Sequence, residues 1–153
     1  MHRLWIRGEW QDSSESKEIR SPYTGETIAL ASQATASQME QALAASCEAF
    51  QKYKKISRFM RSRLLAAMVE GLVARRSELA SGIMAEAGKP IALAEIEVSR
   101  AILTFTAAAE EAKRWSGEII PLDSDASGRA YTPAVSQWVP RGPVLAIGPF
   151  NFP

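Results

Sequence analysis

The apolar repeat that follows Pro90 is the longest regular pattern in the chain, and it constrains the fold more than any other feature. Apolar side chains recur at intervals of three and four, at Ile91, Ala94, Val98, Ala101, Phe105, Ala108, Ala112 and Trp115. This spacing predicts a long helix with one buried face, which Gly117 ends. Alanines at half of these positions allow neighbouring helices to approach closely, whereas a free coiled coil prefers larger branched residues. The pattern therefore predicts a core helix of a globular body.

Three further helices are expected before it. Ser37 and Glu40 have the spacing of a capping box and predict the start of a helix that continues to about Tyr53. A second helix is expected over about 58–75 and a third over about 77–87. Gly88 is then placed to follow the third helix, and Pro90 prevents its continuation. The first helix carries an apolar stripe, formed by Met39, Leu43, Ser46, Phe50 and Tyr53.

Extended segments are expected at both ends of the chain. Turn residues at Gly8 and at 21–25 predict two hairpin-like connections between Leu4 and Ser32. The last third should contain a short strand at 118–122 and an extended segment at 129–139, in which Pro133 favours an edge or a bulge. The apolar run Val144 to Ile147 is typical of a parallel strand buried on both faces. Together these elements predict an α/β fold.

The composition excludes several classes of function. Of 153 residues, 46% are apolar and 23% charged, and the net charge is +1, so no strong field attracts nucleic acid or a membrane surface. His2 is the only histidine, so neither a histidine metal site nor a Ser-His-Asp triad is expected. Cys47 is the only cysteine and lies beside the apolar stripe, which favours a buried thiol over a reactive one. With no long apolar segment, we expect a cytoplasmic protein.

A basic cluster surrounds the start of the second expected helix. Such clusters can bind phosphate backbones. Here the nearby aromatic residues fall on the apolar stripe and do not form a stacking platform, so a solvated face is the favoured interpretation. The cluster consists of Lys52, Lys54, Lys55, Arg58, Arg61 and Arg63.

The end of the chain, VPRGPVLAIGPFNFP, resembles the start of the cofactor domain of the aldehyde dehydrogenase superfamily. In that family a strand leads into a Pro-aromatic-Asn-aromatic-Pro turn, here 149–153. Other segments resemble the family in the same order along the chain: IRGEW and SPYTGETIA its N-terminal hairpins, AGKP its TGKP segment, and SGEIIPL the segment after its long helix. The resemblance covers nearly all of this chain but only the front of the family's length.

The resemblance implies a truncated aldehyde dehydrogenase fold. Residues 1–153 would be the N-terminal part of the cofactor-binding domain: N-terminal hairpins, four helices, assembly strands and the first strand of a Rossmann-like sheet. The strands at about 118–139 would help the complete enzyme to form a homodimer or homotetramer. The catalytic domain, with its nucleophilic cysteine and general-base glutamate, would lie beyond Pro153, so we expect this chain alone to be inactive.

The resemblance also implies roles for individual residues. Asn151 would stabilise the oxyanion that forms when the cysteine thiolate attacks the aldehyde. Part of the NAD or NADP site would be formed by Ile147, Gly148, Pro149 and Phe150, mainly through the backbone. Phe152 would line the substrate tunnel. The alternative for Asn151 is a structural one, in which its side chain stabilises an Asx turn.

The activity implied is the NAD(P)+-dependent oxidation of a small aldehyde to a carboxylic acid through a cysteine thioester. Phe150 stands where many members have Trp, and Pro143 where Val is common. Both variants resemble enzymes related to lactaldehyde dehydrogenase or to non-phosphorylating glyceraldehyde-3-phosphate dehydrogenase, which favours small polar aldehydes. The choice between NAD and NADP, and between hydrolysis and transfer to CoA, stays open. The alternative function is a non-catalytic interaction module that keeps the helices and the assembly strands.

Overall fold

The structure, a computed structural model, describes residues 2–123, 132–149 and 151–152. Within them it contains four helices and three separate two-stranded antiparallel sheets, which confirms the predicted α/β class. The first two sheets pair β1 (Leu4–Ile6) with β2 (Glu9–Gln11) and β3 (Glu15–Arg20) with β4 (Thr27–Gln33). The helices follow as α1 (Ala36–Tyr53), α2 (Arg58–Ala74), α3 (Arg76–Ala87) and α4 (Ile91–Arg114). The third sheet pairs β5 (Ile119–Pro121) with β6 (Pro133–Val135).

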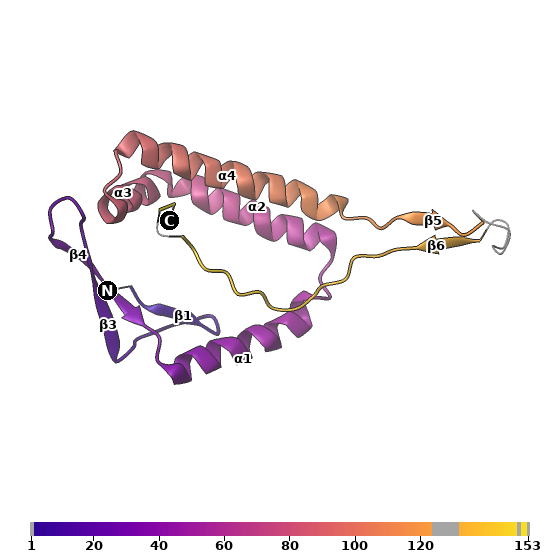
Figure 1. Cartoon of the computed structure of the whole chain (residues 1–153), viewed down its shortest axis with the longest axis horizontal. Helices are drawn as coiled ribbons and strands as arrows, with labels where there is room; N and C mark the ends of the chain where they lie inside the picture. Colours follow the sequence, from indigo (N-terminus) through magenta and orange to yellow (C-terminus); the bar gives the residue numbers. More distant parts are fainter. Residues whose placement is uncertain (1, 124–131, 150, 153) are drawn as a thin grey trace.

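Helix α4 is the centre of the fold, as its apolar repeat predicts. Both α2 and α3 pack along it (Figure 1). At the contact between α3 and α4, the side chains of Ala80, Ala94 and Val98 are buried, and Leu79, Ile83 and Ile102 pack around them. Alanine at the centre of the contact lets the two helix backbones approach closely, while the larger residues fill the edges.

Helix α1 corrects two predictions. It lies on the other side of the C-terminal segment from α2 and α4 (Figure 1) and packs mainly against β1. None of its residues is fully buried: in the predicted stripe, Met39 and Leu43 are exposed and Phe50 is half-buried. Cys47 is exposed as well, whereas the sequence favoured a buried thiol. The periodicity identifies a face of the helix but does not supply the surface that covers it.

The start of α1 was also predicted at the wrong residue. Thr35, with an extended backbone, caps the helix, and its hydroxyl accepts a hydrogen bond from the Gln38 amide. The Gln38 side chain in turn accepts from the Thr35 backbone, which completes a capping box two residues earlier than the predicted one. Gln38 Nε2 also donates to the Asp12 carbonyl oxygen at 2.8 Å. This second bond ties the helix start to the β2–β3 connection and favours the earlier cap.

The predicted N-terminal hairpins are confirmed. In the first, Trp5 pairs with Trp10 and their ring centroids are 4.8 Å apart. Its turn places Arg7 and Gly8 in the left-handed region, with φ of 57° and 85°, as short hairpin turns require. The second hairpin, β3–β4, turns at 21–26, where the Ser21 amide donates to the Glu26 carbonyl oxygen.

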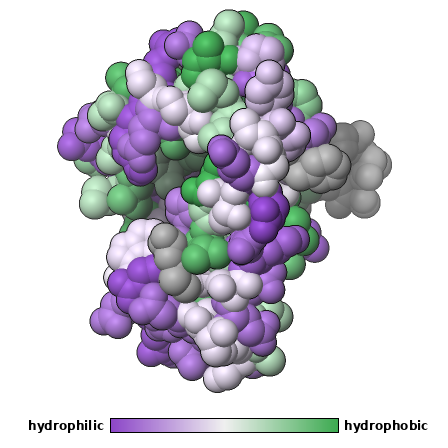
Figure 2. Space-filling view, turned by 90° about the vertical axis from the view of Figure 1, so that its left-hand side faces the viewer, coloured by the Kyte–Doolittle hydropathy of each residue, from purple (hydrophilic) through white to green (hydrophobic). Residues whose placement is uncertain are grey.

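The C-terminal segment is extended but forms no strand ladder among the described residues. In the view of Figure 1 it passes below α2 and above α1, and Asn151 lies against Lys89, just after α3. Val144 and Ile147 are 85% and 84% exposed, so the predicted doubly buried strand at 144–147 is not formed here. A strand needs a hydrogen-bonded neighbour, and apolar composition alone does not provide one. The face of the molecule drawn in Figure 2 is hollowed near its centre, and hydrophobic residues are exposed around this hollow.

Ala94→Leu should destabilise the protein, because the buried contact between α3 and α4 has no room for three more carbon atoms. Overpacking of this kind costs about 1–3 kcal/mol. Urea denaturation followed by circular dichroism measures the loss. Ala107→Leu, at an exposed position of the same helix, is the matched control and should change the stability little. Equal losses in the two variants would contradict the assignment of this core.

A polypeptide of these 153 residues expressed alone should self-associate through the apolar segment that contains Val144 and Ile147. Replacing both residues by Asp should shift the population towards monomer, as measured by size-exclusion chromatography with light scattering. Gln137→Asp adds a charge at an exposed polar position and should not have this effect. A monodisperse monomer of the unaltered chain would refute the prediction.

Candidate functional site

Asn151 and Phe152 lie against the link between α3 and α4. The Lys89 ammonium donates a hydrogen bond to the backbone carbonyl oxygen of Asn151 at 2.7 Å. The same Nζ lies 4.5 Å from the centre of the Phe152 ring, within the range of a cation–π interaction. Residues about 60 positions apart in the sequence are therefore in direct contact at this point.

The local structure of the link explains where Lys89 lies. Gly88 ends α3 in the left-handed conformation, with φ of 65°, and its amide donates to the Met84 carbonyl oxygen. Lys89 comes next, and Pro90 after it is the N-cap of α4. A Cβ added to Gly88 would stand only 2.9 Å from Cγ of Pro22, so the β3–β4 turn packs closely on the link. Glycine is required here both by the backbone and by this contact.

Glu97, two turns along α4, completes the cluster. Its Oε2 lies 2.5 Å from Nζ of Lys89, and the two side chains are only 14% and 21% exposed. Its other oxygen, Oε1, is buried and has no hydrogen-bond partner among the described residues. A shielded pair of this kind is little screened by salt, and the loss of one partner leaves a costly unpaired charge.

Asn151 itself is exposed, and its side-chain amide has no hydrogen-bond partner in the part of the chain that the structure describes. An Asx turn needs a backbone N–H two residues further on. That residue is Pro153, which has no N–H. The structural alternative for Asn151 therefore lacks the usual donor, and the lysine holds the backbone of this residue while its side chain stays available.

The residues predicted to bind the cofactor lie in the same segment. Ile147, Gly148 and Pro149 are exposed and belong to no helix or strand, and a Cβ added to Gly148 would meet no atom within 4 Å. The backbone here is therefore open to a ligand. Phe150 lies outside the described residues. Phe152, predicted to line a tunnel, is 55% exposed, and its contact with Lys89 is described above.

Sequence reasoning missed Lys89 and Glu97 as parts of this site. The sequence identifies AGKP only as a segment that resembles the family, and no motif or periodicity singles out Glu97. Lysine follows no periodic pattern, and its contacts come from a segment that is distant in the sequence. The one available signal was its fixed position between a helix-ending glycine and a helix-starting proline.

The other charged groups are relevant as metal ligands and as members of ion pairs. Among the described residues, no group of three or more His, Cys, Asp and Glu side chains is arranged to hold a metal ion. No helix in the same residues is long and apolar enough to cross a membrane. A side-chain hydrogen bond from Arg75 lowers the pKa of the Glu78 carboxyl and raises that of the guanidinium. This pair is exposed and stands at the start of α3, so its shifted pKa values reflect a surface interaction.

Comparison with known proteins gives consistent matches over almost the whole chain. A model described as the aldehyde dehydrogenase family matches residues 10–153. The 3-sulfolactaldehyde dehydrogenase of Priestia megaterium is 36% identical over 150 residues, which cover 98% of this chain and 31% of that protein. The D-glyceraldehyde dehydrogenase (NADP(+)) of Thermoplasma acidophilum is 32% identical, over 99% of this chain and 30% of that protein. The chain spans about 30% of the length of these curated relatives.

Solved structures give the same result. Aldehyde dehydrogenase 21 from Physcomitrella patens, in complex with the reaction product succinate, superposes with a TM-score of 0.80 at 32% identity. The match covers 84% of this chain and 27% of that one. Succinate-semialdehyde dehydrogenase from Burkholderia pseudomallei has a TM-score of 0.76 at 29% identity, over 82% of this chain and 26% of its own. This chain, with its Lys89-bound Asn151 turn, therefore belongs to the aldehyde dehydrogenase family and corresponds to an N-terminal portion of it.

Proposed function

We propose that this chain forms the N-terminal part, 1–153, of the cofactor-binding domain of an NAD(P)+-dependent aldehyde dehydrogenase, in which Asn151 stabilises the oxyanion. The observation that supports this role best is the arrangement at the end of the chain. Lys89 holds the Asn151 backbone, while the side-chain amide is exposed and unpaired among the described residues. A neutral amide is a suitable donor because it does not titrate at working pH.

In the proposed reaction, a cysteine thiolate from the remainder of the enzyme attacks the aldehyde carbon. The carbon–sulfur bond forms as the carbonyl π electrons move to oxygen, which becomes negatively charged. The Asn151 side chain donates an N–H hydrogen bond to this oxygen and lowers the energy of the transition state. Nothing in this chain replaces the thiolate: Cys47 lies on α1, exposed and in a different part of the molecule from the turn.

The cofactor would be held in part by Ile147, Gly148, Pro149 and Phe150. The open backbone around Gly148 supports this, because a ligand can approach it without a side chain in the way. When bound, NAD or NADP accepts the hydride that the aldehyde carbon loses. Among structural relatives, a betaine aldehyde dehydrogenase from Staphylococcus aureus was solved in complex with NAD+, whereas the Thermoplasma relative is named for NADP(+).

We propose a small polar aldehyde as the substrate, with Phe152 beside its path. The names of three relatives, acting on 3-sulfolactaldehyde, D-glyceraldehyde and lactaldehyde, support this choice. Two plant relatives and one fission yeast relative are named for succinate semialdehyde, so a carboxylate-bearing aldehyde belongs in the same test panel. We further propose a cytoplasmic enzyme, consistent with the single cysteine in these 153 residues.

Strands β5 and β6 are proposed to take part in subunit contacts of a homodimer or homotetramer. They form a projecting two-stranded ribbon (Figure 1) whose apolar side chains, including Ile119 and Val135, are exposed. A ribbon of two strands is marginal on its own and gains stability when it packs on another surface.

Asn151→Ala in the complete enzyme should lower kcat by about 100- to 1,000-fold, because it removes one donor to the developing oxyanion. The measurement is aldehyde-dependent formation of the reduced cofactor, with D-glyceraldehyde, lactaldehyde and succinate semialdehyde as substrates. The affinity for the cofactor should stay the same, since Asn151 is proposed to act only on the reacting oxygen.

Gln51→Ala, which removes an exposed amide on α1, is the matched control and should leave the rate unchanged. Full activity of Asn151→Ala would refute the oxyanion role. If the unaltered protein reduces neither NAD nor NADP with any of the three aldehydes, the proposed enzyme activity is wrong and the non-catalytic interaction module takes its place.

A further inference from the structure

We propose that Lys89, paired with Glu97, is a positioning residue that sets the direction of the Asn151 side chain towards the reacting oxygen. This inference rests on the proposed function of Asn151 and adds a second residue to it. It starts from the direct contact between the Lys89 ammonium and the Asn151 carbonyl oxygen. Lys89 itself is not proposed to touch the substrate.

The three hydrogens of the ammonium match the three groups around it. These groups are Oε2 of Glu97 at 2.5 Å, the carbonyl oxygen of Asn151 at 2.7 Å and the face of the Phe152 ring. Contacts on several sides leave the ammonium little freedom to move. It therefore contacts both residues of the Asn151–Phe152 peptide bond: the backbone carbonyl group of Asn151 and the side-chain ring of Phe152.

The ion pair differs from the others in the described residues. In every other pair both side chains are at least 45% exposed, whereas Lys89 and Glu97 are 21% and 14% exposed. Exposed pairs contribute little because water and salt screen them. A shielded ammonium makes stronger charge-assisted bonds, including the one to the Asn151 carbonyl oxygen. The shielded ion pair thus holds the Lys89 ammonium in place for its hydrogen bond to the Asn151 carbonyl oxygen.

Holding the carbonyl group matters because the side chain starts from the same Cα atom. Once the peptide plane after Asn151 is held, its Cα atom and Cα–C bond are held too. The Cα–Cβ bond can then change direction only by rotation about the Cα–C bond, so the amide samples a smaller region. A displacement of about 1 Å in a catalytic group can reduce the rate by about 100-fold. Lys89 in turn is fixed by the left-handed Gly88 and by Pro90, at the point where α3 meets α4.

The test is a double-mutant cycle in the complete enzyme. Lys89→Met is introduced into the enzyme that keeps Asn151 and, separately, into the Asn151→Ala variant. If Lys89 acts through Asn151, Lys89→Met should lower kcat and kcat/KM by similar factors, up to about 100-fold, with Asn151 present. With Asn151→Ala already in place, the same change should cost about twofold or less. A merely structural role would give the same loss in both backgrounds.

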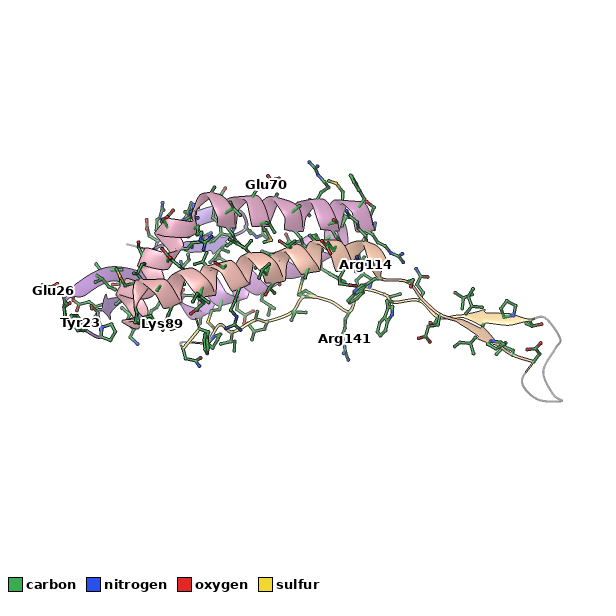
Figure 3. The ribbon with its side chains drawn as sticks, turned by 90° about the horizontal axis from the view of Figure 1, so that it is seen from above. Tyr23, Glu26, Glu70, Lys89, Arg114 and Arg141 are labelled. Atoms are coloured by element: carbon green, nitrogen blue, oxygen red, sulfur yellow. The ribbon has the colours of Figure 1, made fainter. Side chains whose placement is uncertain are left out.

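Removing Lys89 alone leaves Glu97 without its cation and can destabilise the protein. A paired variant, Lys89→Met with Glu97→Gln, removes both charges and carries the test if the single variant does not fold. This paired variant should stay slow, because neither new side chain supplies an ammonium to the Asn151 carbonyl group. Arg114→Met is the matched control: it removes an exposed cation at the opposite end of α4 (Figure 3) and should leave the rate unchanged.

Each outcome of these measurements either supports or refutes the positioning role of Lys89. A rate loss that depends on Asn151 and persists in the paired variant supports the positioning role. Full activity of Lys89→Met, recovery in the paired variant, or equal losses in both backgrounds overturns it, while a slow Asn151→Ala enzyme keeps the proposed function intact. If Asn151→Ala is itself fully active, both the oxyanion role and the positioning role are wrong.

Discussion

The close contact between α3 and α4 is the constraint on which the rest of the structure depends. Ala80 and Ala94 meet at its centre and are almost fully buried, so the two helices cannot shift relative to one another without opening a gap or a clash. Only 88–90 connect the helices. Because both ends of this link are fixed, the position of Lys89 follows from the packing of Ala80 and Ala94, which lie nine residues before it and five after it.

Two contacts of Lys89 connect this helix packing to the candidate site. The lysine between the helices binds the Glu97 carboxylate on α4, and the same ammonium binds the turn that carries Asn151. The packing of α3 against α4 therefore determines where Lys89 lies, and Lys89 in turn holds the residue that carries the exposed amide. The proposed oxyanion donor is thus anchored on the helical layer, even though the segment that precedes it forms no strand ladder among the described residues.

The sequence predicted most of the secondary structure and little of the burial. The four helices, both N-terminal hairpins and the strands at 119–121 and 133–135 occur close to where turn residues and periodicity placed them, with the cap of α1 two residues earlier than predicted. Cys47 and the stripe of α1 were expected to be buried, yet Cys47 and most of the stripe are exposed, because an amphipathic helix does not contain the partner that would cover it. The run 144–147 has the composition of an inner strand, yet strand formation needs a neighbouring backbone.

In the candidate site, too, some residues could be predicted from the sequence and others only from the tertiary structure. Asn151 and its neighbours became candidate site residues because a local segment, the proline-flanked turn after an apolar run, resembles the corresponding segment of the aldehyde dehydrogenase family. The tertiary structure decided that this turn contacts Lys89 and Glu97, side chains whose spacing along the chain follows no period. Local order is encoded by residues within about one turn of each other, and the sequence determined it. Burial, ion pairing and the support of Asn151 depend on groups far apart in the chain, and only folding brings these together.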